Sequence, residues 1–127
     1  MSDSSERPSY NGGRNIAIKV PPHEWEKTVA FYRDILGLPV IENNLPSATP
    51  TVVFQFGNNQ LWVDRVETLS QAEIWLELNT SDITASAQHL RQAGVVRRDE
   101  IESLDFEAFW VSSPAGIIHL VSRDEVS

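Results

Sequence analysis

Side chains able to do chemistry occur in two strand-like segments that alternate polar and apolar residues. Asn15 and Lys19 occupy one phase of the first segment. Glu73 and Glu77 occupy the matching phase of the second. Because alternate residues of a strand point to opposite faces, these side chains should line one mixed face of each strand. Carboxylates on such a face can bind a cation, ligate a metal or accept a proton.

Three tryptophans accompany these polar groups. Trp62 has the same strand phase as Asp64, Trp75 has the phase of Glu73, and Trp110 is a third candidate on a later strand. Indole rings in a concave site provide a stacking surface for planar or cationic ligands. A second interpretation stays open, in which the rings fill the interior of the fold.

The elements that position these residues occur twice along the chain. The strand beginning at Asn15 resembles the one beginning at Glu73, an offset of 58 residues. Each is followed by a helical segment that ends at a glycine, and Gly37 and Gly94 are 57 residues apart. The first helix should open at Pro21-Pro22. It should pack through residues at helical spacing, which are Trp25, Val29, Phe31, Tyr32, Ile35 and Leu36.

The full order predicts an α+β fold built from two β-α-β-β-β modules. Residues 1–13 are polar and are interpreted as a mobile tail. The first module is expected over 14–66 and the second over 72–127, with 67–71 as the linker. The remaining strands are expected at 38–43, 50–56, 60–66, 95–101, 106–112 and 116–122, and the second helix from about 82 with Ser81 or Asp82 at its N-cap.

Two segments resemble the vicinal oxygen chelate superfamily, which includes glyoxalase I, bleomycin-resistance proteins and extradiol dioxygenases. Ala30-Phe-Tyr-Arg-Asp-Ile-Leu-Gly-Leu38 is similar to the end of the family's first helix. Val111-Ser-Ser-Pro-Ala-Gly-Ile-Ile-His-Leu120 is similar to its last turn and strand, with Ser113 where aspartate is usual. The resemblance implies two half-barrels around a shared cavity and a homodimer.

Metal-dependent members of this family take ligands from the first and last strands of each module. The resemblance places three of those positions at Asn15, Glu73 and His119, and the 57-residue offset of the glycines gives Trp62 as the partner of His119 in the first module. Trp62 offers no lone pair and an asparagine oxygen is a weak ligand, so this set departs from a usual metal site. No cofactor is therefore expected. A divalent metal held by Glu73 and His119, with Asp64 as a third donor, is the alternative.

Glu73 and His119 also suggest chemistry without a metal. The family arrangement would bring them together at the cavity floor, where the carboxylate could orient the imidazole for general acid–base catalysis. The other interpretation is an ion pair that only fixes the strands. Lys19 is expected to extend its ammonium to the cavity rim.

Composition limits the partners. The chain has 127 residues, no cysteine and a formal net charge of −8. An acidic surface repels nucleic acid and anionic membranes, and no apolar run is long enough to span a bilayer. The absence of cysteine and of an apolar leader favours a cytoplasmic protein.

These observations favour a small-molecule-binding protein of the glyoxalase/bleomycin-resistance type with a degenerate metal centre. Its ligand would be planar or cationic, held by Asn15, Lys19, Trp62, Asp64, Trp75, Glu77 and Trp110. The alternative is a metal-dependent, glyoxalase-like lyase, isomerase or dioxygenase. A third possibility is a structural or partner-binding protein whose cavity is filled by tryptophan.

Overall fold

The computed structural model describes residues 7–41, 50–104 and 106–124. They form two compact units, each described below by itself. The first unit is Arg14–Trp75, and the second joins residues 7–13 to those from Leu76 onward. The sequence had suggested a module boundary within the segment 67–71, but the first unit continues to Trp75.

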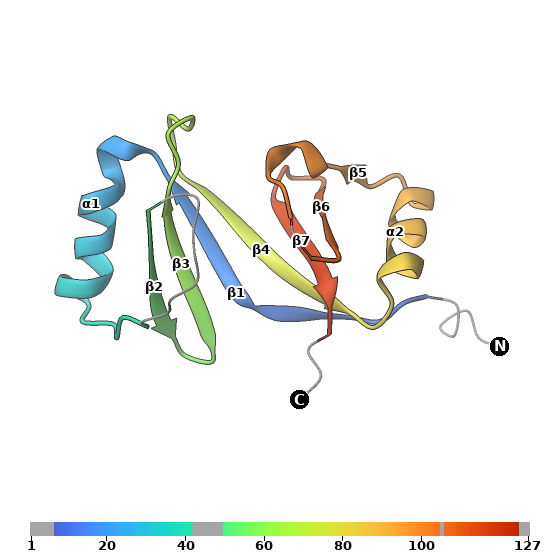
Figure 1. Cartoon of the computed structure of the whole chain (residues 1–127), viewed down its shortest axis with the longest axis horizontal. Helices are drawn as coiled ribbons and strands as arrows, with labels where there is room; N and C mark the ends of the chain where they lie inside the picture. The colour runs from blue at the N-terminus through green and yellow to red at the C-terminus, as the bar shows by residue number, and fades with distance from the viewer. Residues whose placement is uncertain (1–6, 42–49, 105, 125–127) are drawn as a thin grey trace. The chain divides into compact units, whose positions relative to one another are not determined.

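Strands β1 (Tyr10–Val20) and β4 (Glu73–Thr80) both cross the boundary between the units. Each therefore has residues in both units. The first unit also contains α1 (Pro22–Ala30), a π-helical turn (Phe31–Ile35), β2 (Thr51–Phe56) and β3 (Asn59–Arg65). Its strands lie in the order β2-β3-β1, with β3 parallel to β1 and antiparallel to β2 (Figure 1).

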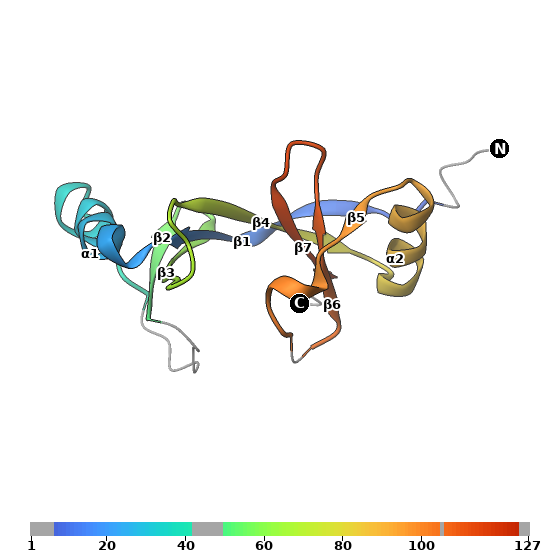
Figure 2. The same cartoon turned by 90° about the horizontal axis from the view of Figure 1, so that it is seen from above.

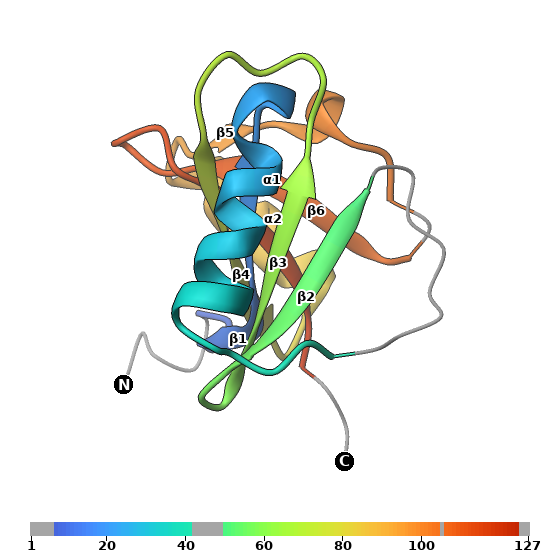
Figure 3. The ribbon, with the colours of Figure 1, turned by 90° about the vertical axis from the view of Figure 1, so that its left-hand side faces the viewer.

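Helix α1 begins where the sequence predicts, with Pro21 as N-cap and Pro22 in the first turn. Proline suits this place because its fixed φ is helical and its missing N–H would have had no partner. The helix lies against the sheet of its unit (Figure 3). Its Val29 joins the buried cluster of Val20, Phe54, Leu61 and Val63, and Trp25 and Tyr32 pack against that cluster.

The prediction that the apolar stripe of the first helix packs along its whole length is wrong for three residues near the end of the helix. Phe31, Ile35 and Leu36 are 44%, 74% and 51% exposed. The Leu36 N–H donates to Phe31 O at 3.0 Å, five residues back, so the last turn is wider than an α-helical turn. This extra residue rotates Leu36 off the inner face, and Leu38 packs against the core instead.

The second unit contains the rest of β4, α2 (Ile83–Gln92), β5 (Val96–Arg97), a 3-10 turn (Asp99–Ile101), β6 (Ala108–Ser112) and β7 (Ile118–Arg123). Its strands lie in the order β4-β7-β6-β5. Strand β6 is antiparallel to both of its neighbours, and a tight turn joins it to β7 (Figure 2).

Helix α2 is capped as predicted, because Asp82 Oδ1 accepts a hydrogen bond from Ala85 N–H at 2.9 Å. Such a cap stabilises a helix by about 1 kcal/mol. Ile83, Ala87 and Leu90 face a cluster formed by Phe109, Val111 and Val121. Gly94 then takes a positive φ of 82°, which ends the helix.

The predicted mobile tail of residues 1–13 is wrong over its last part. Strand β1 already begins at Tyr10, whose ring packs against the core of the second unit. Tyr10 Oη and Ser86 Oγ are 2.7 Å apart, and the buried Thr80 hydroxyl donates to Ser9 O at 2.9 Å. These partners lie more than 70 residues along the chain, so the local polarity of the segment gave no sign of them.

The predicted strand at 38–43 is reduced to an isolated bridge between Val40 and Phe54. Its last two residues, 42 and 43, lie outside the described residues. The α+β class and the repeated order of strands and helix are confirmed. The shared cavity would lie between the two units and stays a prediction.

Candidate functional site

One face of the first unit carries the polar residues singled out in the sequence. On β1 and β3, the residues Val20, Leu61 and Val63 are buried towards α1. Lys19 lies opposite Asp64 in the parallel register of β1 and β3. Strand alternation therefore puts Asn15, Lys19, Trp62 and Asp64 on the other face, as predicted. We call these residues, with Glu73 and Trp75, the tryptophan face.

A buried ion pair lies at the centre of this face. Lys19 Nζ is 2.7 Å from Asp64 Oδ2, and each residue is only 7% exposed. Thr51 Oγ1 donates to the second carboxylate oxygen at 2.8 Å. The expectation that the ammonium reaches the rim is wrong, because Asp64 provides its counter-charge inside the unit. Removing either charge would break a buried ion pair, which is strongly destabilising.

The Trp75 indole is held at its face and at its edge. Lys19 Nζ lies 4.3 Å from the ring centroid, within the range of a cation–π interaction. The indole N–H donates to Glu73 Oε1 at 3.0 Å. The ring is half-buried and Glu73 is exposed, so solvent reaches part of the indole and its acidic neighbour. An aromatic surface of fixed orientation can take a planar ligand with little loss of entropy.

Asn15 and Trp62, which occupy the family's metal-ligand positions in the first unit, contact each other. Trp62 Nε1–H donates to Asn15 Oδ1 at 2.8 Å. The asparagine oxygen, the better potential ligand of the two, is thus engaged by an indole. Both side chains are half-buried, which leaves the pair partly accessible.

His119 lies on a different side of its strand from the one expected. In the β6–β7 register it pairs with Val111, and Val121 pairs with Phe109. Directly paired residues share a face, and Val111, Phe109 and Val121 form the core under α2. His119 therefore corresponds to Leu61 of the first unit rather than to Trp62. Its Nδ1 lies 3.0 Å from Ile117 O.

Glu73 and His119 belong to different units, so the acid–base pair between them stays a prediction. The structure brings Glu73 to Trp75 instead. Trp110 is also removed from solvent, since it is 5% exposed and its Nε1–H donates to Glu102 O at 3.0 Å. Buried to this degree, its ring offers almost no surface for a ligand to stack on.

The polar face of the second unit includes residues that sequence reasoning missed. Asn79 follows Glu77 in the same strand phase, and Asn79 Nδ2–H donates to Ser122 Oγ at 3.0 Å. A pocket of about 390 Å³ is lined by Glu77, Asn79, Phe106, Glu107, Ser122 and Arg123. Alternation along β4 could have indicated Asn79, whereas Phe106 and Glu107 precede β6 and no periodic pattern marks them.

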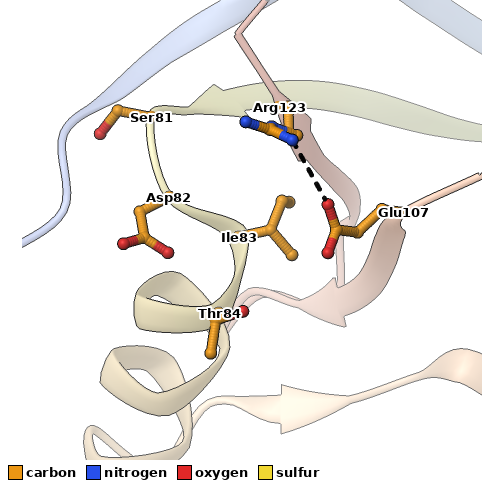
Figure 4. A pocket seen from close by; sticks show the side chains of 6 residues that line it. All are labelled: Ser81, Asp82, Ile83, Thr84, Glu107 and Arg123. Carbon is orange, nitrogen blue, oxygen red and sulfur yellow. Dashed lines mark ion pairs between the residues drawn. The ribbon is translucent and has the colours of Figure 1, made fainter.

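A smaller hollow of about 310 Å³ lies at the start of α2 (Figure 4). Ser81, Asp82, Ile83 and Thr84 line one side of it. Glu107 and Arg123 face each other on the other side, 3.8 Å apart. The same ion pair therefore belongs to the walls of both hollows.

The donor set of the described residues does not fit a divalent metal site. Among residues 7–41, 50–104 and 106–124, no three His, Cys, Asp or Glu side chains are grouped so that they could hold an ion. Asp64, the candidate third donor, accepts from Lys19 and Thr51. Trp62 has no lone pair to give.

None of the helices in the described part of the chain combines the length and the apolar character needed to cross a bilayer.

Solved structures share this fold at low sequence identity. A Mn(II)-bound glyoxalase from Novosphingobium aromaticivorans is 16% identical, with a TM-score of 0.63 over 94% of this chain and 43% of that one. A glyoxalase/bleomycin resistance protein/dioxygenase superfamily member from Vibrio splendidus 12B01 is 15% identical, with a TM-score of 0.61 over 90% of this chain and 100% of that one. Homoprotocatechuate 2,3-dioxygenase from Arthrobacter globiformis is 18% identical, with a TM-score of 0.60 over 93% of this chain and 37% of that one.

Among curated proteins, none has a sequence that matches this chain. The model of the glyoxalase-like domain family matches residues 16–118, which is most of the chain. The two β-α-β units, the shared fold and this match lead to one conclusion: the chain belongs to the glyoxalase-like domain family of the vicinal oxygen chelate superfamily.

Proposed function

We propose that this protein binds a small planar molecule on the tryptophan face without a resident metal. The observation that carries the proposal is the fixed Trp75 indole, held by Lys19 at its face and by Glu73 at its edge. A planar ligand stacks on the accessible part of the indole. A cationic or hydrogen-donating group on that ligand reaches the exposed Glu73 carboxylate.

The proposal assigns separate tasks to the two tryptophans. Trp75 provides the stacking surface. Stacking contributes about 0.5–1.5 kcal/mol to the binding free energy beyond the contribution from the area that the ligand ring buries. Trp62 and Asn15 form a half-buried, hydrogen-bonded pair that borders the site. The ion pair of Lys19 and Asp64 stays inside the unit and keeps Trp75 in place.

Tryptophan fluorescence tests this proposal. The protein is titrated with a panel of planar aromatic compounds, cationic and neutral, and compared with Trp75→Phe and Glu73→Gln. Trp75→Phe should abolish most of the emission change, and Glu73→Gln should weaken cationic members of the panel selectively. Trp25→Phe is the matched control, because Trp25 lies on α1 and its Nε1–H donates to Val63 O in the core. A panel that never alters emission, or a response that Trp25→Phe removes instead, would refute the site.

Metal analysis separates binding from the alternative of a metal-dependent, glyoxalase-like enzyme. The purified protein is analysed for manganese, iron, nickel and zinc beside the variants Glu73→Ala and His119→Ala. Stoichiometric metal that both variants lose would overturn the metal-free proposal in favour of the enzyme. Metal far below stoichiometry, unchanged in the variants, agrees with ligand binding alone.

A further inference from the structure

The pocket of the second unit has the features of an independent ligand site. Its volume of about 390 Å³ lies in the range typical of small-molecule pockets. All of its lining residues belong to the second unit, so it does not depend on the tryptophan face. Three kinds of surface meet in it: a hydrogen-bonding floor, an aromatic wall and charges of both signs.

The floor consists of Asn79 and Ser122. Their side chains are hydrogen-bonded to each other at 3.0 Å, and Ser122 is only 8% exposed. The Asn79 amide and the Ser122 hydroxyl both have further donor and acceptor capacity. Polar groups that converge on a hollow in this way fix the orientation of a small ligand.

The charged groups lie around this floor. Glu77 is packed directly against Gly13, where even a single methyl group on the glycine would overlap the carboxylate side chain. Arg123 and Glu107 form a long ion pair of 3.8 Å, and their side chains are 69% and 61% exposed. An exposed pair of this length contributes little to stability, so either partner can turn to a ligand at small cost.

The apolar wall is Phe106, which is 54% exposed. An apolar group that covers this exposed phenyl ring removes apolar surface from water, which favours binding. The site therefore offers a cationic group, two carboxylates and an aromatic ring around one small volume.

We propose that this pocket binds a small zwitterion of the amino-acid class with an apolar side group. The ligand carboxylate pairs with Arg123, its ammonium with Glu107, and its side group covers Phe106. A zwitterion supplies both charges at once. Glu107 and Arg123 can therefore give up their mutual ion pair for ion pairs with the ligand, and neither charge is left unpaired. An amine or a carboxylic acid alone satisfies only half of the site.

Titration of the full-length, ¹⁵N-labelled protein followed by NMR tests the proposal. The probes are L-phenylalanine, 2-phenylethylamine and 3-phenylpropionate, which share a phenyl group but differ in charge. Saturable shifts should occur at the Asn79 side-chain amide and at the backbone amides of Phe106 and Ser122. Both single-charge probes should bind about tenfold more weakly than the amino acid or worse.

Variants decide whether the shifts report this pocket. Arg123→Gln and Glu107→Gln should each weaken L-phenylalanine about tenfold or more. Arg98→Gln is the matched control, since Arg98 is another arginine of the second unit in an ion pair with a glutamate, Glu100. The proposal is overturned if L-phenylalanine causes no saturable shift or if the three probes bind equally. It also fails if Arg98→Gln costs as much as Arg123→Gln in variants whose spectra show that they are folded. Because the readout is confined to the second unit, failure here leaves the test of Trp75 unaffected.

Discussion

The two units use the same scaffold positions in opposite ways. Val20 and Leu78 belong to the cores of their units, as do Val63 and Val121, and both pairs are 58 residues apart. The neighbouring positions Lys19 and Asp64 thus correspond to Glu77 and Ser122. In the first unit these positions hold a buried ion pair. In the second they line an open pocket.

The difference teaches what closes such a face. In the first unit, a long cationic side chain and a carboxylate cover the face of the paired strands β1 and β3 and neutralise each other's charge. A carboxylate and a small hydroxyl cannot do so, and a hollow results. The duplicated framework therefore contains one position pair that forms an ion pair inside its unit and one that lines a pocket.

Breaking the ion pair of the first unit should have the largest effect. Asp64→Ala removes the carboxylate that lies 2.7 Å from the buried Lys19 ammonium, and we expect a loss of about 3–5 kcal/mol in the free energy of unfolding. Urea denaturation measures it. The double variant Lys19→Met/Asp64→Leu should be more stable than Asp64→Ala, because it buries neither of the two charges. A loss below about 1 kcal/mol for Asp64→Ala would contradict the role assigned to the pair.

Transferring the pair to the second unit should close its pocket. In Glu77→Lys/Ser122→Asp the new side chains occupy the positions equivalent to Lys19 and Asp64. We expect the protein to stay folded and its affinity for L-phenylalanine to fall at least about tenfold. The NMR titration of the second unit measures this. Unchanged affinity in a folded variant would show that the two position pairs are not equivalent.

Weakening the contact of Tyr10 with the core of the second unit should have a smaller effect on stability. Tyr10→Phe removes the tyrosine hydroxyl, which is the hydrogen-bond partner of the fully buried Ser86 hydroxyl. We therefore expect the free energy of unfolding to fall by about 1–2 kcal/mol. Hydrogen exchange should show reduced amide protection in α2 and β7. Tyr32→Phe, in the core of the first unit, is the control and should leave that protection unchanged. If the control has the same effect on α2, the assignment of Tyr10 to the second unit is incorrect.

The exposed pair of Arg33 and Asp34 should have the smallest effect, in contrast to the buried pair of the same unit. Two hydrogen bonds of 2.9 Å from Arg33 lower the pKa of the Asp34 carboxyl in the folded state. A lowered folded pKa gives a stabilisation that is present above the unfolded pKa and lost as the pH falls through the folded one. Asp34→Asn should therefore be slightly less stable than the wild type at neutral pH and converge with it in acid. Urea midpoints measured over pH 2–7 (roughly the range in which carboxyls titrate) test this, and a gap that widens in acid would contradict it.

Local patterns predicted much of the framework. Strand alternation placed Lys19 and Asp64 on one face, and the Asp82 cap follows from the preference of that position for a side-chain acceptor. Contacts with distant partners could not be predicted in this way. The burial of Lys19 depends on a residue 45 positions away, and the π-helical turn shifts Leu36 out of phase without any sign in the apolar spacing.

The candidate site was predicted less well than the framework. Using the 57-residue offset of the glycines for the last strand put His119 opposite Trp62. The cores give 58, and a shift of one residue moves a side chain to the other face of a strand. The pocket residues Phe106 and Glu107 lie outside regular elements, where neither periodicity nor the repeat applies.

The early strand that ends up in the second unit has a consequence for the order of assembly. Tyr10 is synthesised before the rest of the core that it packs against, and its partner Ser86 follows 76 residues later. The N-terminal segment must wait until α2 and β4 exist, while α1 and β3 can already pack together. Closing so long a loop is slow compared with local folding. A fusion or truncation that displaces Tyr10 would thus disturb the unit whose core is completed later.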